Sequence, residues 1–480
     1  MNNSSVNSRR HRYAIRASLL AIGMATGIAG AQQVVPDNVN PARDTLRRQQ
    51  DLDEATRLER GGVAPPARRI EYDEVLAQPD DINLNFGWAQ TQVSRGDIKG
   101  AANTLERMLL TAPNEARVRL LYAVVLFRLE RLDEAERELL LVRGLPMEPA
   151  LRAEIDRYRR EIEVAKQQTR FTASISMATQ YDWNRNSSPR SGEALLFDTR
   201  LPVAAADRRK SDWQLQTIAR IEMTHDIGGQ DNDRLNVAAS YVRGEQARED
   251  QFDFQVGSVE FGGAIDFAPT WVVPTVYARR LTLGNQRYGR IEGGNLRVEQ
   301  RVSGRFTVYG FSEAENQTYA SVSRSTRAPE RSGVQVLAGV GASWIVNPSH
   351  RLNFELGPAW KNARESFESY RGVTSTLTHT WLLGQGIFLV TALGGDANFY
   401  DEPEQLVSTR KRQDRIARVR TTLGVPLGIL INDEQLAQSV LVRDITMFVS
   451  LEGIRARSTL TNNAYDNHRV AFGVTKRWDF

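Results

Sequence analysis

The chain has 480 residues, and its 62 Lys and Arg against 58 Asp and Glu give a net charge of +4. This near balance argues against a nucleic-acid-binding protein, and the 41% of apolar residues argue against global disorder. The absence of cysteine excludes disulfides, thiolate metal sites and a cysteine nucleophile. At ~100–200 residues per domain, the length predicts roughly two to four domains.

The first 31 residues predict a secretory signal peptide. Arg9, Arg10, Arg12 and Arg16 precede an apolar run over residues 17–31 that ends in small residues. We expect cleavage after position 31 and an exported mature chain. A membrane anchor is the alternative, but the run is shorter than the ~20 apolar residues of a spanning helix. No later segment is apolar enough to span as a helix, so the exported chain is either soluble or a closed barrel.

Residues 32–80 predict a linker, because they contain Pro36, Pro41, Pro65 and Pro66 together with many charges. One short polar helix is expected within it, around residues 44–60.

Residues 81–168 predict a tetratricopeptide-like helical domain. A period of about 34 residues, typical of this repeat, relates three pairs of positions: Trp88 and Tyr122, Ala101 and Ala135, and Leu105 and Leu139. Glu130 stands where a turn glycine is usual, and residues 148–168 predict a single capping helix in place of a third repeat. An unrelated pair of helical hairpins is the alternative. Two repeats are marginal alone, so we expect this domain to depend on a partner or on the rest of the chain.

Residues 169–480 predict an antiparallel membrane β-barrel. Apolar side chains such as Trp213 and Leu215 alternate with polar ones such as Gln214 and Gln216, and this pattern recurs in about 14 or 15 segments. Because single-chain bacterial barrels have even numbers of strands, one of 15 segments would not be a barrel strand. Residues 194–203 form the weakest segment. A soluble sandwich or propeller is the alternative, but the polar parity is too charged for a dry core. Aromatic residues near segment ends predict interface girdles: Trp271, Tyr277, Trp344, Trp360 and Trp381.

The polar parity predicts the lining of a hydrated lumen with salt-bridged walls. It is rich in arginine, with glutamates between, and the candidate lumen residues are Arg220, Glu222, Arg279, Arg297, Glu299, Arg301, Glu355, Arg418 and Arg420. Each of them can alternatively serve only to brace the barrel from inside.

The C-terminal strand resembles the signal by which the outer-membrane assembly machinery recognises its barrels. Phe472, Val474, Trp478 and the terminal Phe480 share one parity, which Lys476 interrupts. An ordinary edge strand at the end of a soluble protein is the alternative.

No catalytic or metal-binding pattern is found in the sequence. His225, His350, His379 and His468 lie in separate segments without a ligand partner at i+2 or i+4, and there is no Gly-x-Ser-x-Gly motif or phosphate-binding loop. We expect no enzyme activity, no metal and no cofactor.

The order of segments resembles the surface lipoprotein assembly modulator (Slam) family. The barrel segment begins with a Tyr-Asp-Trp-Asn-Arg-Asn stretch at residues 181–186, similar to the Tyr-Asp-x-Asn-x-Asn of that family, and residues 83–168 also look like its helical region. The resemblance covers about residues 81–480. It implies a 14-stranded barrel in the outer membrane of a Gram-negative bacterium, with a periplasmic helical domain that helps specific lipoproteins or secreted proteins reach the cell surface.

The resemblance also implies partners: a polypeptide client, the barrel assembly machinery, a periplasmic chaperone and the lipid bilayer, but no nucleic acid. The client would contact the concave helical face, where the candidate residues are Asn83, Phe86, Gln90, Val93, Arg117, Leu120, Val124 and Phe127. Packing into the domain core is the alternative for the apolar members.

Two other transport functions remain open. An exopolysaccharide export porin also joins tetratricopeptide repeats to a barrel, although it usually has more repeats and an acidic or aromatic sugar path. A passive solute porin with a periplasmic scaffold domain is the other candidate.

Overall fold

The computed structural model describes residues 70–480, except residues 96, 130, 145–148, 228–232, 268, 324, 432–438 and 440. The expected signal peptide and the expected linker helix around residues 44–60 lie outside the described residues. The described chain divides into a helical unit, which ends at Arg170, and a barrel unit, which begins at Phe171.

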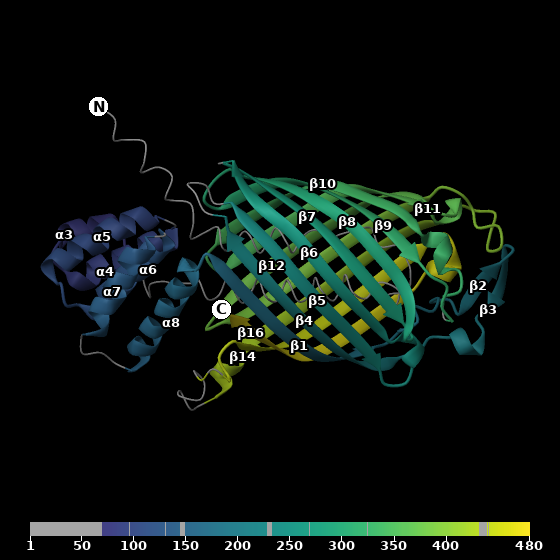
Figure 1. Ribbon diagram of the computed structural model, residues 1–480, viewed down its shortest axis with the longest axis horizontal. Helices are drawn as coiled ribbons and strands as arrows, with labels where there is room; N and C mark the ends of the chain where they lie inside the picture. The colour runs from purple at the N-terminus through teal and green to yellow at the C-terminus, as the bar shows by residue number, and fades with distance from the viewer. Residues whose placement is uncertain are drawn as a thin grey trace. The chain divides into compact units, whose positions relative to one another are not determined.

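The helical unit consists of antiparallel helix pairs (Figure 1). Its described helices are α3 (Tyr72–Ala77), α4 (Ile82–Arg95), α5 (Ile98–Thr111), α6 (Ala116–Arg128), α7 (Leu132–Arg143) and α8 (Pro149–Lys166). The predicted repeats correspond to α4–α5 and α6–α7, and α8 is the expected final helix. Helix α3 lies in the segment that the sequence assigned to the linker. None of the described helices is long and apolar enough to cross a membrane.

The small and large positions of the repeat form the core of the helical unit. Ala101, Leu105, Ala135 and Leu139 are all 0% exposed. The alanines allow close helix approach, and the leucines fill the space between the helices. Asp97 caps α5, because its carboxylate accepts a hydrogen bond from the backbone N–H of Gly100 at 2.9 Å.

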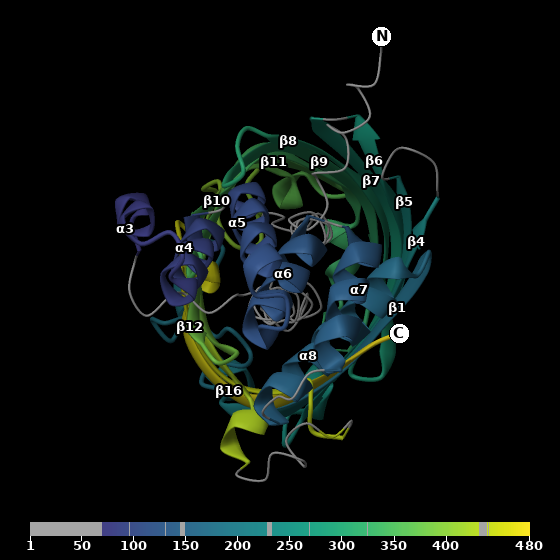
Figure 2. The same ribbon diagram turned by 90° about the vertical axis from the view of Figure 1, so that its left-hand side faces the viewer.

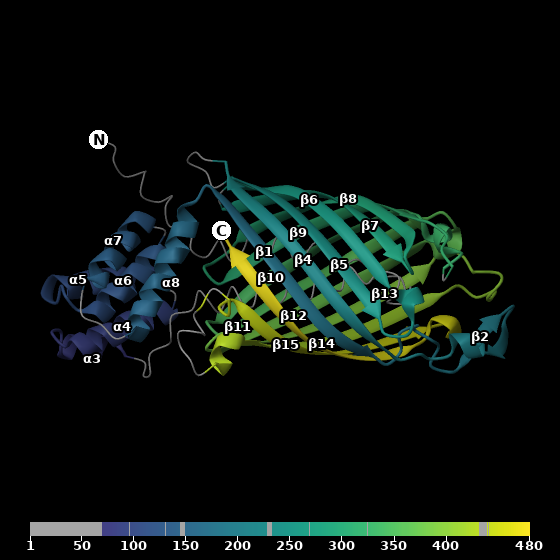
Figure 3. The same cartoon turned by 60° about the horizontal axis from the view of Figure 1, so that its bottom comes forward.

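The barrel unit is a closed antiparallel sheet of 14 described strands, which confirms the predicted fold class. Figure 2 looks along this barrel and Figure 3 shows its strands from the side. The strands are β1 (Thr169–Asp182), β4 (Asp212–Asp226), β5 (Arg234–Gln246), β6 (Phe254–Phe267), β7 (Thr270–Leu283), β8 (Gln286–Arg301), β9 (Phe306–Tyr319), β10 (Gly333–Asn347), β11 (His350–Ala363), β12 (Tyr370–Gly384), β13 (Ile387–Tyr400), β14 (Gln413–Pro426), β15 (Ile445–Ser458) and β16 (Asp466–Asp479). They follow chain order around the barrel, and β1 closes the sheet by pairing with β16.

The weakest predicted segment, residues 194–203, is not a barrel strand. It forms a separate two-stranded sheet of β2 (Glu193–Leu196) and β3 (Thr199–Pro202). This hairpin belongs to the long connection between β1 and β4, and the barrel therefore keeps an even number of strands.

The two ends of the barrel differ in their connections. We call the end at which β1 begins and β16 ends the turn end, and the opposite end the loop end. At the loop end, long connections join β1 to β4, β9 to β10 and β13 to β14. At the turn end, β10–β11 and β12–β13 are joined by two-residue turns, at 348–349 and 385–386, and the long connection at this end joins β14 to β15.

The outward face of the barrel is apolar, as a lipid-facing surface requires. Val259, Phe261, Val340 and Phe472 are outward and between 50% and 63% exposed. Exposed tryptophans lie near both ends of the strands: Trp213 and Trp360 near the loop end, and Trp344 and Trp381 near the turn end.

Two predicted girdle residues, Trp271 and Tyr277, are on the wrong face. Both share the inward parity of Arg279 on β7: Tyr277 is 6% exposed, and Trp271 lies directly opposite the inward Glu299 of β8. These two aromatic residues therefore belong to the interior wall and not to the lipid interface.

Candidate functional site: the charged interior of the barrel and its loop end

The inward faces of the strands bring the predicted lumen residues together. The structure places all nine on the inward parity of β4, β7, β8, β11 and β14. Arg301 is the last residue of β8 and lies at the turn end. The other arginines of the set form ion pairs with inward carboxylates, which include Glu222, Glu299 and Glu355 and come in part from other strands.

The wall formed by β8, β9 and β11 contains one such group around Arg297. Its guanidinium lies 2.6 Å from Glu299 and 3.9 Å from Glu355. The same guanidinium lies 3.5 Å from the ring centroid of Tyr309, whose hydroxyl donates to Glu355 at 3.1 Å. An arginine is thus held between a π face and two carboxylates, which compensates for its removal from water.

A second group of the same composition lies on β7 and β9. Arg279 lies 4.0 Å from the ring centroid of Tyr277 and 3.8 Å from Glu315. The hydroxyl of Tyr277 lies 2.9 Å from a carboxylate oxygen of Glu315 and also within hydrogen-bond distance of Glu313, so the two carboxylates share its one proton. The two groups repeat one Tyr-Arg-Glu arrangement along the interior wall.

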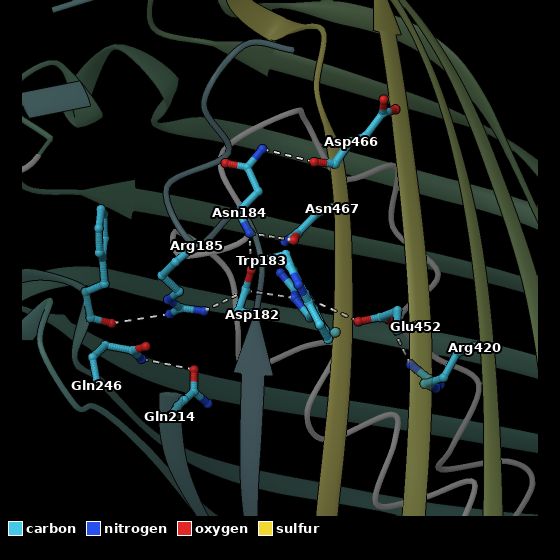
Figure 4. A network of polar contacts seen from close by, with 12 residues as sticks. Asp182, Trp183, Asn184, Arg185, Gln214, Gln246, Arg420, Glu452, Asp466 and Asn467 are labelled. Atoms are coloured by element: carbon cyan, nitrogen blue, oxygen red, sulfur yellow. Dashed lines mark hydrogen bonds and ion pairs between the residues drawn. The ribbon is translucent and has the colours of Figure 1, made fainter. Parts of the chain in front are cut away.

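A third group joins the last barrel strands to the first. Arg420 on β14 lies 3.8 Å from Glu452 on β15, and Glu452 lies 3.1 Å from Arg469 on β16. Arg469 in turn lies 2.9 Å from Asp182, the last residue of β1. The chain of charges continues to Arg185 at 3.7 Å from Asp182, so it spans the β1–β16 closure (Figure 4).

The Tyr-Asp-Trp-Asn-Arg-Asn stretch forms the loop-end part of this third group. Asn184 donates its backbone N–H to Asp182 and to Asn467, both at 2.9 Å. Arg185 is 2% exposed and donates to the carbonyl of Phe252 at 3.4 Å. Trp183 instead is 40% exposed. Polar residues of this stretch therefore fasten the first connection to β16 and to the β5–β6 connection.

The remaining loop-end connections are also tied to one another by charge. Arg412 lies 2.8 Å from Asp414 and 4.0 Å from Glu368 of the β11–β12 connection. Burial raises the pKa of Glu368, although Arg412 and Arg331 act in the opposite direction. Arg327 of the β9–β10 connection forms ion pairs with Glu330 and with Glu404 of the β13–β14 connection.

The strained turn of the β2–β3 hairpin is hydrogen-bonded to the β13–β14 connection. Phe197 and Asp198 have φ values of +48° and +61°, which residues with a Cβ rarely adopt. Their backbone N–H groups donate to Leu406 at 2.9 Å and Val407 at 3.0 Å. Hydrogen bonds from Ser408 and Thr409 lower the pKa of Asp198. The loop end is consequently a connected structure and not a set of independent loops.

Sequence reasoning missed many interior partners. Glu260, Glu313, Glu315 and Asp396 all face inward. The interior therefore holds more carboxylates beside its arginines than the sequence analysis had identified. The parity of each strand could have placed these carboxylates on the inward face. Their arginine partners could not have been predicted, because they depend on the register between strands.

The predicted client-binding residues do not form one exposed face. Val93, Leu120 and Val124 are buried members of the helical core, and Phe86 and Phe127 are partly buried and pack against it. Asn83 and Arg117 are exposed, and Gln90 is partly exposed. The alternative of core packing thus holds for the apolar members of the predicted face, whereas client binding by the exposed members stays a prediction.

The C-terminal strand places its predicted signal residues on the outward face. Phe472, Val474 and Phe480 are 44% to 56% exposed, and Trp478 shares their parity. Phe480 continues the sheet, since its backbone exchanges hydrogen bonds of 2.8 and 3.0 Å with Phe171. The side chain of Lys476 also lies outward and donates to the carbonyl of Arg443 at the turn end.

Two histidines that are distant in sequence meet on adjacent strands. His350 Nδ1 and His379 Nε2 lie 3.0 Å apart, and their rings are stacked. Within the part of the chain that the structure describes, no group of three or more His, Asp or Glu residues could hold a metal ion.

Comparisons with known proteins match the helical region to a repeat family and find solved structures of low similarity. Residues 73–147 match the tetratricopeptide repeat family. No curated protein matches the chain. Similar solved structures include the outer membrane channel DcaP of Acinetobacter baumannii, at 9% identity and a TM-score of 0.36, over 65% of this chain and 98% of that chain. Another is the outer membrane protein OprD from Pseudomonas aeruginosa, at 6% identity and a TM-score of 0.33, over 65% and 94%.

A third is CdiB from Acinetobacter baumannii, at 9% identity and a TM-score of 0.35, over 65% of this chain and 60% of that chain. These similarities are too low to bear on function. The strand pairing and the outward apolar face define the barrel by themselves. The chain thus joins a helical region that matches the tetratricopeptide repeat to a closed 14-stranded β-barrel of the outer-membrane type.

Proposed function

We propose that the protein helps specific lipoproteins or secreted proteins reach the cell surface, as in Slam-like translocation. In this proposal the helical unit captures the polypeptide client, and the barrel provides its route across the outer membrane. The turn end would face the periplasm, since the chain enters and leaves the barrel there.

One observation carries the proposal: a tetratricopeptide region is joined almost directly to the first barrel strand. Helix α8 ends at Lys166 and β1 begins at Thr169, so only Gln167 and Gln168 lie between them. Stacked helical repeats supply extended surfaces for binding polypeptides. A diffusion channel for small solutes needs no such module, whereas a translocator needs to select its client.

The charged interior of the barrel is compatible with transport, but it does not by itself indicate which class of molecule passes through. Its paired charges form a polar wall that a hydrated polypeptide can pass without entering an apolar environment. The Tyr277 and Tyr309 rings are covered by Arg279 and Arg297, so they offer a sugar ring no open aromatic face. A saccharide-conducting porin is the second candidate, because inward carboxylates such as Glu222 can accept hydrogen bonds from sugar hydroxyls.

Surface proteomics of intact cells with and without the gene tests the proposal. Protease shaving should show that one or two proteins leave the surface and accumulate in the periplasm when the gene is deleted. Complementation with the wild-type chain should restore them. An unchanged surface proteome, together with saccharide-dependent single-channel currents of the purified protein, would favour the porin instead.

A variant series separates client capture from barrel assembly. Exposed residues of the helical unit, such as Asn83 and Arg117, can be changed to Asp and Glu without removing core packing. We expect lower surface delivery with an unchanged amount of folded barrel. As a matched control, Lys99→Glu changes another residue of the helical unit outside the predicted face and should leave delivery unchanged.

A further inference from the structure

An unusual group of arginines lies on the outward face of the barrel near the loop end. We call it the outer arginine patch, and it consists of Arg371 on β12, Arg415 on β14, and Arg455 and Arg457 on β15. All four side chains are exposed. Each of them lies among the four strand residues nearest the loop end of the barrel. Their inward neighbours, such as Asp414 and Ala456, are buried at 1% and 3% exposure.

The register of the sheet sets two of these charges against each other. Arg415 lies directly opposite Arg457 in the antiparallel pairing of β14 with β15. Directly opposite side chains have Cβ atoms about 4.5–5.5 Å apart, and like charges in this arrangement destabilise the sheet. Nothing in the fold requires arginine at either position, because both side chains point away from the barrel.

Carboxylates do not neutralise the outer arginine patch. Among the described residues, none lies within ion-pair distance of Arg371, Arg415 or Arg457. Asp466 is the acid that meets Arg455, at 3.7 Å, but it also pairs with Arg190 at 3.2 Å. An excess of positive charge is left on this outward surface.

On the opposite wall of the barrel, two outward arginines have carboxylate partners within the protein. Arg243 on β5 has Glu245 two residues along the same outward row, at 2.6 Å. Arg290 on β8 lies opposite Arg280 but forms an ion pair with Glu292, again two residues along the strand. Arg243 and Arg290 are therefore paired with carboxylates of the protein, in contrast to the outer arginine patch.

We propose that the outer arginine patch binds the phosphate groups of an anionic lipid in the leaflet at the loop end. Guanidinium groups bind phosphate oxygens in a bidentate manner, and a phosphate between Arg415 and Arg457 converts their repulsion into two attractions. Arg371 pairs in register with Trp360 and with Phe399, which are 42% and 46% exposed and mark the aromatic belt. Head groups lie at this level of a bilayer.

The spacing of the outer arginine patch favours a lipid with more than one phosphate. Arg371 and Arg415 are separated by one strand, β13, and neighbouring strands lie about 4.8 Å apart. Two phosphates roughly 10 Å apart can thus be bound together. This inference depends on a membrane-spanning barrel but not on the proposed transport of a client.

Native mass spectrometry of the full-length protein in detergent tests the inference. The probes are a bisphosphorylated glucosamine lipid, its dephosphorylated form, and inorganic phosphate. The patch variant is R415Q/R457Q, and the matched control is R243Q/R290Q, which removes two outward arginines from the opposite wall. Heat-modifiable electrophoretic mobility verifies that both variants contain folded barrel.

We expect the bisphosphorylated lipid to bind the wild type and the control equally, and the patch variant about tenfold more weakly or less. The dephosphorylated lipid should bind all three weakly. Equal binding by the patch variant, or equal loss in the control, would overturn the inference. Tight binding of inorganic phosphate without lipid binding would overturn the lipid as the source of the phosphate.

Discussion

The helical unit and the barrel use apolar side chains in opposite directions. In the helical unit, Leu105 and Leu139 are 0% exposed and form the interior. In the barrel, Val340 is 63% exposed on the outward face, whereas Arg297 and Glu299 are 3% and 6% exposed on the inward face. The difference shows that two solvents shape one chain: water surrounds the first unit, and lipid surrounds the second. Apolar side chains therefore lie inside the helical unit but on the outside of the barrel.

Removing an interior charge should give the largest effect in the barrel. Arg469 lies 2.9 Å from Asp182 and 3.1 Å from Glu452. Arg469→Met leaves both carboxylates without this partner, and we expect a loss of about 3–5 kcal/mol in the free energy of unfolding. Urea unfolding in lipid vesicles measures it. The outward Arg243→Met serves as the control and should change this free energy by about 0.5 kcal/mol or less; a similar loss in both would contradict the comparison.

Removing an interior apolar side chain should give the corresponding effect in the helical unit. Leu139→Ala creates a cavity in the core and should cost about 2–5 kcal/mol. The expected result is a lower melting temperature of the helical circular dichroism signal, while the barrel keeps its heat-modifiable mobility. Leu141 on the same helix is 54% exposed. Leu141→Ala should leave the melting temperature nearly unchanged, and equal shifts would show that this helix is not packed as described.

A charge at an exposed apolar position sharpens the comparison further. Val340 is the eighth residue of β10 (Gly333–Asn347), near its middle. Val340→Arg should cost about 2–4 kcal/mol, because the guanidinium would face the middle of the bilayer. Leu110 of the helical unit is 81% exposed, and Leu110→Arg should cost about 0.5 kcal/mol or less. The fraction that folds on dilution into lipid vesicles measures both, and equal yields would contradict a lipid-facing β10.

The smallest expected effect is a pH dependence at the loop end. The pKa of Glu368 is raised by burial, so the folded state binds its proton more tightly than the unfolded state does. The local structure is then most stable below the raised pKa and loses stability as the pH rises through it. We expect amide exchange of the β11–β12 connection to be slower at about pH 5 than at about pH 8, after correction for intrinsic rates. Glu368→Gln should abolish this difference, and a pH dependence that persists would assign it to another group.

The strand array was predictable because its signal is local. Every second residue faces lipid, so the alternation of Trp213, Gln214, Leu215 and Gln216 is visible without knowledge of any partner strand. The weak segment at residues 194–203 lacks a sustained alternation, and it forms the β2–β3 hairpin. Parity also placed the nine lumen candidates on the inward face.

Two expectations failed because general residue preferences were given more weight than position. Trp271 and Tyr277 were assigned to an aromatic girdle, although their even spacing from Arg279 already put both on the inward face. Leu120 and Val124 were assigned to a binding face, although their positions in α6 place them in the core between the repeats. Aromatic and branched apolar residues serve both roles, and only their neighbours distinguish them.

The kinds of element, their order and the lipid-facing side of each strand could be predicted from the amino-acid sequence. These properties follow from periodicity, because each position senses mainly whether it meets water, lipid or a packed interior. Which charged side chains form ion pairs depends instead on how the strands pair in three dimensions. Asp182 and Arg469 are 287 positions apart in the chain, and they lie 2.9 Å apart because barrel closure sets β1 beside β16 in one register. Register is a property of strand pairs, so neither the interior ion pairs nor the opposed Arg415 and Arg457 can be read from one strand alone.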